Sequence, residues 1–250
     1  MEPQIVPAAA RTLDIFETFA SEQRPLSLSE LARLADIPVS TCHSLMRTLE
    51  QRGFLHFLTP REAYPTRKML DITNQIDSHD PIAARLAPAL ARLRDDTGET
   101  VILGSRQAEA ALYLLVLESP QTVRYTARVG EFKPLHSSSI GKTFLGEMAE
   151  DDLNTWLGGS RELHTITPHT IVSQRQLKRD LAEARERGYF ATRGENVADV
   201  MAIAAPLHLG SVTLGVAVAG PLHRMQDMEK RHSQKLLAAL KTIEKDFAAP

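Results

Sequence analysis

The sequence predicts an α+β protein with two domains, a small helical one first and a larger one that combines helices with a mostly antiparallel sheet. Two observations lead to this prediction. Apolar residues recur at helical spacing through the first quarter of the chain, whereas strand-like apolar runs dominate after residue 100. A chain of 250 residues is also long enough for two hydrophobic cores. We place the domains at residues 1–67 and 80–250, joined by a linker at 68–79.

The composition excludes several classes of protein. The chain is 43% hydrophobic and 24% charged, which is typical of globular domains and not of disordered or collagen-like chains. Its single cysteine, Cys42, cannot form an internal disulfide or a thiolate zinc cluster. No segment approaches the roughly 18 consecutive apolar residues of a membrane span, and the histidine spacings match no metal motif. We therefore expect a cytoplasmic protein with no membrane segment, metal or cofactor.

Three short helices are predicted near the N-terminus. Apolar spacing indicates the first over residues 9–19. Ser27-Leu28-Ser29-Glu30 matches the capping box, in which a hydroxyl and a carboxylate satisfy free backbone N–H groups, so a second helix follows over residues 28–35. Pro38 imposes a tight turn, and a third helix follows, with Val39 or Ser40 as its predicted cap and Gly53 at its end.

A β-hairpin and a linker helix follow the third helix. Residues 54–58 alternate as a strand, residues 59–62 form a turn, and residues 63–66 return as the partner strand. Two helices at a short turn, followed by a hairpin, make a winged helix-turn-helix. A helical linker over residues 68–78 leads to the second domain.

The second domain opens with a helix over residues 82–96, which we expect Pro88 to bend. Strands are predicted at residues 101–105, 110–118, 123–128, 190–192, 200–206 and 212–219. Helices are predicted at residues 139–148, 173–187 and 228–247. Strands in runs, with helices grouped between them, indicate an α+β domain.

The third helix carries residue types that read DNA. A recognition helix enters the major groove by its N-terminal residues, where hydroxyls suit phosphates and His or Arg side chains reach base edges. A merely solvated helix face is the competing interpretation. The candidate DNA-binding residues are Ser27, Ser40, Thr41, His43, Ser44, Arg47, Thr48, Arg61, Arg67 and Lys68.

The distribution of charge favours DNA binding, although the net charge does not. The whole chain has a formal net charge of -2, which argues against a nucleic-acid partner. Residues 1–46 have three basic and six acidic side chains, but residues 47–68 have five basic and two acidic ones. The end of the third helix and the hairpin therefore carry an excess of three positive charges.

Nine segments in a consistent order make the chain similar to the IclR family of transcriptional regulators. They are residues 11–16, 26–32, 38–41, 45–55, 118–121, 128–130, 134–142, 187–189 and 203–206. The resemblance implies a DNA-binding winged helix, a linker helix used in dimerisation and a GAF-like domain that binds a small-molecule effector. It also implies homodimers, often paired into homotetramers, on near-palindromic double-stranded operators.

Two segments depart from the family. Ser44 stands where members commonly have Arg, which puts a base contact at that position in doubt. Tyr64-Pro65-Thr66-Arg67 replaces the common Tyr-x-Leu-Gly. We expect Pro65 to shorten the second hairpin strand and Arg67 to add a phosphate contact.

A Gly-Lys-Thr sequence at residues 141–143 is also found in phosphate-binding loops. His136 occupies the position of that motif's first glycine, and no apolar strand precedes it, so we reject a nucleotide site. Free N–H groups at a helix start and three hydroxyls suit a carboxylate instead, unless the serines simply cap the helix. With the positions that the resemblance assigns to the ligand pocket, the candidate effector-binding residues are Arg124, His136, Ser137, Ser138, Ser139, Ile140, Thr192, Val200, Ala202, Ala217 and Ala219.

Two further expectations concern the effector. Arg124 and Arg128 lie on one face of a predicted strand, and Arg124 is the candidate partner for a carboxylate, whereas solvation explains Arg128 better. Ala202, Ala217 and Ala219 stand where family members that bind small hydrophilic acids have polar side chains. Fewer polar groups and more space favour a larger or more apolar acid, for example an aromatic one.

The whole sequence predicts a ligand-responsive regulator of a catabolic pathway, with repression favoured over activation and no enzymatic activity. The rival is an enzyme that uses the C-terminal pocket and dimerises through its N-terminal segment, although no nucleophile or paired acid–base motif supports it. A ligand sensor that acts through another protein is the third alternative.

Overall fold

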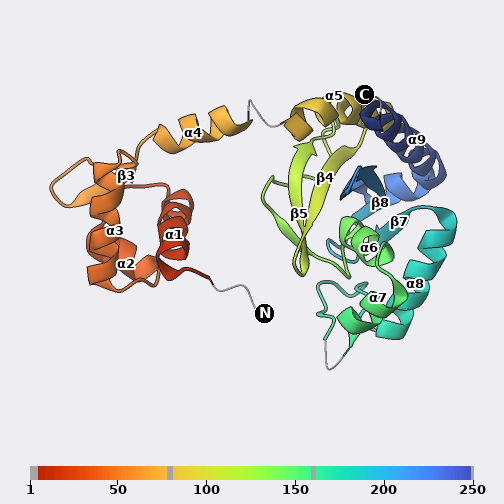
Figure 1. The fold of residues 1–250 in the computed structure, drawn as a ribbon, viewed down its shortest axis with the longest axis horizontal. Coiled ribbons are helices and arrows are strands. Elements are labelled where there is room, and N and C mark those ends of the chain that lie inside the picture. Colours follow the sequence, from red (N-terminus) through yellow and green to blue (C-terminus); the bar gives the residue numbers. More distant parts are fainter. Residues whose placement is uncertain (1–4, 78–80, 159–161, 249–250) are drawn as a thin grey trace. The chain divides into compact units, whose positions relative to one another are not determined.

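The computed structural model describes residues 5–77, 81–158 and 162–248, and the chain divides into two compact units at residue 80. The first unit is a winged helix-turn-helix (Figure 1). Its elements are α1 (Pro7–Glu22), β1 (Leu26–Ser27), α2 (Leu28–Leu34), α3 (Val39–Gln51), β2 (Leu55–Phe57), β3 (Glu62–Pro65) and α4 (Lys68–Asp77). The strands form an antiparallel sheet in the order β1-β3-β2. The predicted helices and hairpin are therefore confirmed, and the short strand β1 is an addition.

The start of α2 is held by the predicted capping box. The Ser27 hydroxyl accepts a hydrogen bond from the Glu30 backbone N–H at 3.4 Å, and the Glu30 carboxylate accepts one from the Ser27 N–H at 3.0 Å. Arg24 pairs with the same carboxylate at 3.0 Å. Hydrogen bonds from Ser27 and Arg24 lower the pKa of Glu30 to about 2, so this carboxylate stays charged at neutral pH.

The second hairpin strand, β3, ends at Pro65, one residue before the predicted end at residue 66. Pro65 is the last residue of β3 and is the register partner of Leu55. Because proline has no N–H, the next ladder position is supplied by Thr66, whose N–H donates to the Phe54 carbonyl at 2.9 Å.

The second unit is an α+β domain, as the sequence predicts (Figure 1). Its six-stranded antiparallel sheet has the order β6-β5-β4-β9-β8-β7. The strands are β4 (Thr100–Gln107), β5 (Ala110–Leu117), β6 (Phe132–Pro134), β7 (Phe190–Arg193), β8 (Val200–Leu209) and β9 (Val212–Pro221). The helices are α5 (Pro81–Thr97), α6 (Ser139–Gly146), α7 (Glu150–Leu157), α8 (Gln174–Arg187) and α9 (Leu222–Ala248). Neither β6 nor α7 is among the predicted elements.

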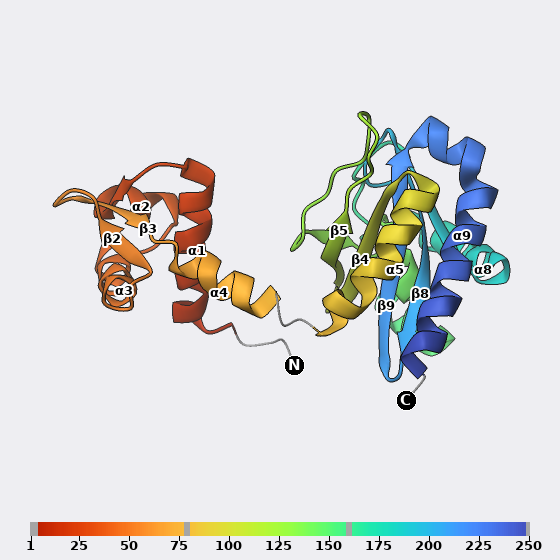
Figure 2. The same ribbon diagram turned by 90° about the horizontal axis from the view of Figure 1, so that it is seen from above.

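The two faces of this sheet bury separate hydrophobic cores. Alternate residues of β4 point to opposite faces, so Val101 joins the core under α5 and α9, whereas Ile102 joins the core under α6 and α8. Figure 2 shows α5 and α9 lying along the sheet. The α5 helix runs through Pro88, and its Leu86, Leu90 and other apolar side chains pack on the sheet.

Residues 123–128, which the sequence predicts as a strand, are irregular, so that prediction is wrong. Two of their backbone carbonyls accept hydrogen bonds from side chains and not from a neighbouring strand. The Thr100 hydroxyl donates to the Tyr125 carbonyl at 2.6 Å, and the Arg224 guanidinium donates to the Val123 carbonyl at 3.0 Å. The edge of the sheet is formed by β6, which pairs with the start of β5.

Two glycines let α6 lie directly on the sheet. Gly104 of β4 and Gly215 of β9 are register partners, and Ile140 at the start of α6 packs over both. A Cβ atom on Gly215 would stand 2.7 Å from Cγ2 of Ile140, closer than real Cβ atoms approach their neighbours. The N-terminus of α6 is therefore placed over the centre of the sheet.

A buried ion cluster ties α6 to the rest of the unit. The Lys142 ammonium group is fully buried and lies 2.7 Å from an Asp180 carboxylate oxygen and 2.7 Å from a Glu195 carboxylate oxygen. Burial raises the pKa of Glu195, an effect that the charge of Lys142 opposes. Lys142 belongs to α6, Asp180 to α8, and Glu195 to the turn between β7 and β8. One side chain thus joins three segments that are remote in sequence.

We predict that Lys142→Met lowers the free energy of unfolding of this unit by about 3–5 kcal/mol, because it leaves two carboxylates without their cation in a buried site. Asp180→Asn should cost less, since Lys142 keeps Glu195 as a partner. The measurement is urea denaturation followed by the fluorescence of Trp156, the one tryptophan of the chain. The exposed Lys241→Met is the matched control. Similar small losses in Lys142→Met and in the control would contradict a structural role for the cluster.

Candidate nucleic-acid interface and effector cavity

The α3 helix has one buried and one exposed face. Cys42, Met46 and Leu49 pack into the core of the first unit. The opposite face exposes Val39, Ser40, His43, Ser44, Arg47 and Thr48. Thr41 is half-buried at its margin. The helix therefore places five of the six α3 residues predicted to bind DNA on a single solvent-facing stripe.

Contacts within α3 already use part of this polar face. The Ser44 hydroxyl donates to the Ser40 carbonyl at 3.1 Å, and the Thr48 hydroxyl donates to the Ser44 carbonyl at 2.9 Å. Both hydroxyls thus present acceptor lone pairs to solvent rather than their hydrogens. The Arg47 guanidinium forms an exposed ion pair with Glu50 at 2.9 Å.

The other predicted DNA-binding residues divide into two groups. Arg61, in the turn of the hairpin, and Arg67, after β3, are exposed cations on the surface of the first unit. Lys68 donates to the Arg52 carbonyl at 2.6 Å, where it satisfies the C-terminal end of α3. Ser27 is engaged in the capping box of α2. The side chains of Lys68 and Ser27 thus have structural partners within the unit.

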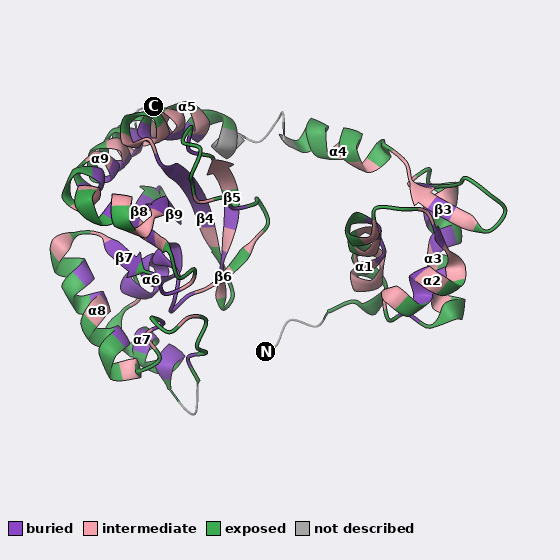
Figure 3. Cartoon of the chain, turned by 180° about the vertical axis from the view of Figure 1, so that it is seen from behind, coloured by how far each residue is buried: buried purple, intermediate pink, exposed green. Residues whose placement is uncertain are grey.

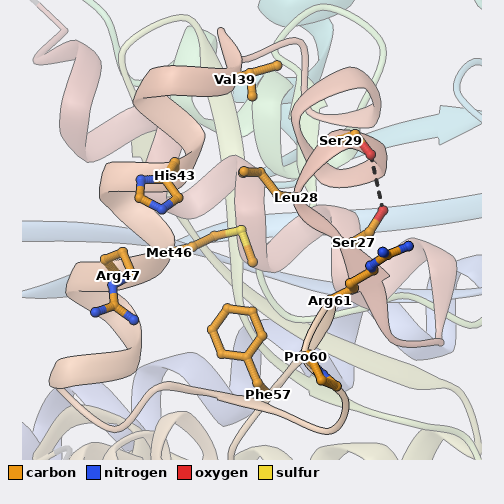
Figure 4. Close-up of a pocket in the computed structure, with 10 residues that line it drawn as sticks. All are labelled: Ser27, Leu28, Ser29, Val39, His43, Met46, Arg47, Phe57, Pro60 and Arg61. Carbon is orange, nitrogen blue, oxygen red and sulfur yellow. Dashed lines mark hydrogen bonds between the residues drawn. The ribbon is translucent and has the colours of Figure 1, made fainter.

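A groove of about 470 Å³ lies between α3, the start of α2 and the hairpin (Figure 4). Its floor is apolar and includes Met46 and Phe57, and Val39 lines its upper end. His43, Arg47 and Arg61 provide the nitrogen atoms at its margins. Cationic margins on an apolar floor suit a nucleic-acid strand, whose phosphates are charged and whose sugars and base methyl groups are not.

The predicted effector loop forms the N-terminus of α6. The Ser138 hydroxyl accepts from the Gly141 N–H at 3.2 Å and donates to the Pro134 carbonyl at 2.7 Å. A Cβ atom on Gly141 would lie 2.4 Å from Cα of Leu135, so this close turn requires glycine. Ser138 is therefore the helix cap, as one of the two sequence interpretations has it.

A small cavity of about 30 Å³ adjoins this helix start. Seven of the candidate effector-binding residues line it: Ser138, Ser139, Thr192, Val200, Ala202, Ala217 and Ala219. Ile102, Tyr113, Tyr125, Asn196 and Val197 complete its wall. The structure thus brings together residues from α6, β4, β5, β7, β8 and β9 and from three connecting segments.

Four candidate effector-binding residues lie elsewhere. Arg124 is exposed and pairs with Glu118 at 3.0 Å, outside the residues that line the cavity. The buried His136 ring donates to the His164 carbonyl at 3.0 Å, and burial lowers its pKa. Ser137 accepts a hydrogen bond from Asn196 at 3.2 Å, and Ile140 packs in the core.

Two tyrosines occupy the space that the sequence assigns to a larger ligand. The alanines at three wall positions leave room, but the side chains of Tyr113 and Tyr125 line the same space. Tyr113 belongs to β5, and Tyr125 belongs to the irregular segment after β5. Burial raises the pKa of Tyr113, and a hydrogen bond with Tyr125 acts in the same direction. The expectation of additional open space is therefore wrong for this conformation. The inward alternation of Ala111 and Tyr113 along β5 is a signal that sequence reasoning missed.

The cavity wall is uncharged. Its described lining residues include hydroxyl, phenol and amide groups but no Arg, Lys, His, Asp or Glu. Among the residues that the structure describes, no three His, Cys, Asp or Glu side chains are placed to hold a metal ion. None of the described helices has the length and apolar character needed to cross a membrane.

Comparison with known proteins identifies the family. The model of the IclR helix-turn-helix domain matches residues 8–58, and the model of the bacterial transcriptional regulator IclR C-terminal domain matches residues 74–247. A crystal structure of an IclR homologue from Microbacterium hydrocarbonoxydans, complexed with 4-hydroxybenzoate, has the same fold. It matches with a TM-score of 0.80 over 97% of this chain and 100% of that one, at 24% identity.

Two relatives of known sequence agree with this assignment, and both are transcriptional regulators rather than enzymes. The acetate operon repressor of Salmonella typhimurium is 29% identical over 89% of this chain and 82% of its own length. The regulator BhcR of Paracoccus denitrificans is 32% identical over 88% of this chain and 79% of its own length. The chain therefore belongs to the IclR family of DNA-binding transcriptional regulators.

Proposed function

We propose that this protein is a ligand-responsive repressor of a catabolic pathway that binds a near-palindromic operator as a homodimer or homotetramer. The observation that carries the proposal is the exposed polar stripe of α3 beside the groove, with Arg47 and Arg61 at its margins. Residues 47–68 supply an excess of three positive charges to this region. Repression is favoured over activation because a relative that spans most of the chain is an operon repressor.

We predict that Arg47→Ala weakens binding to the DNA upstream of this protein's own gene by about 1–3 kcal/mol and relaxes its sequence preference. Arg67→Ala should weaken binding to all sequences and reduce the salt slope by about one. Fluorescence anisotropy over a series of salt concentrations measures both effects.

The matched control for Arg47 is Arg179→Ala. Arg179 is likewise an exposed helical arginine, paired with Glu183 at 3.5 Å, but it lies on α8 of the second unit. Its removal should leave DNA binding unchanged. An Arg47→Ala variant that binds the same DNA as tightly as the control would contradict a role of α3 in recognition.

The dimer that we propose assembles through α4. The apolar residues Met69, Leu70, Ile72 and Ile76 recur along this helix, and none of them is buried (Figure 3). An amphipathic helix that buries no apolar side chain in its own unit favours pairing with a second copy. Such pairing would set the two α3 helices on half-sites about one helical turn, roughly 34–36 Å, or a multiple of it, apart.

We expect α4 also to transmit the effector signal. Replacing Thr73, Asn74 and Gln75 by glycine should leave effector affinity intact, because the cavity lies in the other unit, and should abolish the influence of effector on DNA binding. Alanine at the same positions is the control, since it preserves the helix. Calorimetry and anisotropy measure the two affinities. Full coupling in the glycine variant would refute the role of this helix.

The effector that we propose is a small aromatic acid whose ring takes the place of the Tyr125 side chain. The present cavity has a volume of about 30 Å³, on the order of one water molecule, so a ring needs space that Tyr125 now fills. Tyr125 lies in an irregular segment and not in a strand, and its movement breaks no sheet ladder. A homologue of the same fold binds 4-hydroxybenzoate. Ser139 and the free N–H groups of α6 suit the carboxylate.

Calorimetric titration of the full chain with benzoate and with glyoxylate tests the effector class. Benzoate should bind, and Tyr125→Ala should lower its Kd because no ring then has to be displaced. Phe132→Ala, an exposed aromatic residue on β6, is the control and should change neither affinity. Tight binding of glyoxylate without binding of benzoate would exclude an aromatic effector.

A further inference from the structure

The α3 face that we expect to meet DNA contains one apolar side chain among its polar ones. Val39 is the first residue of the helix and is 56% exposed. His43 and Arg47 follow at intervals of four, so all three lie along one side of α3 and line the same groove. Figure 4 shows Val39 at the upper end of this groove, above His43. An apolar group therefore leads the side of the helix that points toward DNA.

Folding of the first unit does not account for Val39. Its side chain is outside the buried core, which takes Cys42, Met46 and Leu49 from the same helix. Valine is also a poorer helix former than alanine because its branched Cβ restricts the side chain. An exposed valine at this position thus adds nothing to helix stability that a smaller residue would not supply.

In the major groove of DNA, the thymine methyl group is a partner for an apolar side chain such as that of Val39. The C5-methyl group of thymine is the one apolar group that projects from the major-groove edges of the bases, and phosphates gain nothing from an apolar side chain. The N-terminal residues of a recognition helix are the ones that reach these edges. The Ser44 hydroxyl donates to the Ser40 backbone carbonyl, and Ser40 has only a short polar side chain, so Val39 is the apolar surface at this end of the helix.

We propose that Val39 reads a thymine C5-methyl group, so that each half-site of the operator carries an A·T pair opposite the start of α3. This inference rests on the proposed DNA-binding function. It adds a specificity-determining residue that acts by apolar contact, whereas Arg47 and His43 act by charge and hydrogen bonding.

The experiment uses the full chain and a library of random-sequence duplexes. The duplexes that the protein retains are sequenced, and each thymine of the best binder is replaced singly by deoxyuridine, which lacks only the 5-methyl group. One replacement in each half-site should raise Kd about fourfold, the equivalent of one buried methylene group. In Val39→Ala the thymine and deoxyuridine duplexes should bind equally.

The ratio of the two affinities is measured within one variant, so a general loss of stability does not imitate the result. Val6→Ala is the matched control, since Val6 is also exposed and lies before α1, and it should retain the fourfold ratio. The inference is overturned if no thymine is sensitive to the methyl group, or if the sensitivity persists in Val39→Ala. Retention of no duplex at all would overturn the proposed DNA-binding function as well.

Discussion

The cavity of the second unit depends on the buried ion pairs of the Lys142 ammonium group. This group holds the turn between β7 and β8 against α6 and α8 through Glu195 and Asp180. The next residues of that turn, Asn196 and Val197, form part of the cavity wall. Because a charge removed from water needs its partners in place, this cluster tolerates little displacement of the three segments. We therefore expect the wall to move least on the side of α6 and β7.

The same cluster explains why the Gly-Lys-Thr sequence is not a phosphate site. In a phosphate-binding loop the lysine points toward the ligand, but here Lys142 points toward two carboxylates and is absent from the cavity lining. Gly141 serves a close approach to Leu135 and not a phosphate cradle. The rejection of a nucleotide site from the residue at position 136 agrees with this arrangement.

The sequence predicts the first unit well because its signals are local. The capping box at Ser27 and Glu30 spans four residues, and Pro38 acts on its immediate neighbours, so each turn can be read without knowledge of the tertiary fold. The signal for the start of α6, its Ser138 cap, is likewise local. Three acidic residues at the beginning of α7 are also a local signal of a helix start, although this helix is not among the predicted elements.

The remainder of the cavity depends on contacts that sequence periodicity does not contain. Residues 123–128 alternate like a strand, but their hydrogen-bond partners are side chains 25 and 101 residues away in sequence. Those partners turn Tyr125 into the space beside the wall alanines and leave Arg124 outside. The family resemblance thus points to seven residues that line the candidate cavity, whereas only the tertiary fold decides how much of that cavity the tyrosines fill.

The ion pair between Arg47 and Glu50 has a consequence for how such a protein finds its site on a chromosome. In the proposed mode of binding, Arg47 releases Glu50 before it contacts DNA, and because the pair is exposed this release costs at most about 1 kcal/mol. At the correct base pair, two directed hydrogen bonds outweigh the lost partner. Under the proposed DNA-binding function, Glu50 thus weakens each non-target contact by this small amount, and only the operator offers the additional hydrogen bonds that outweigh it.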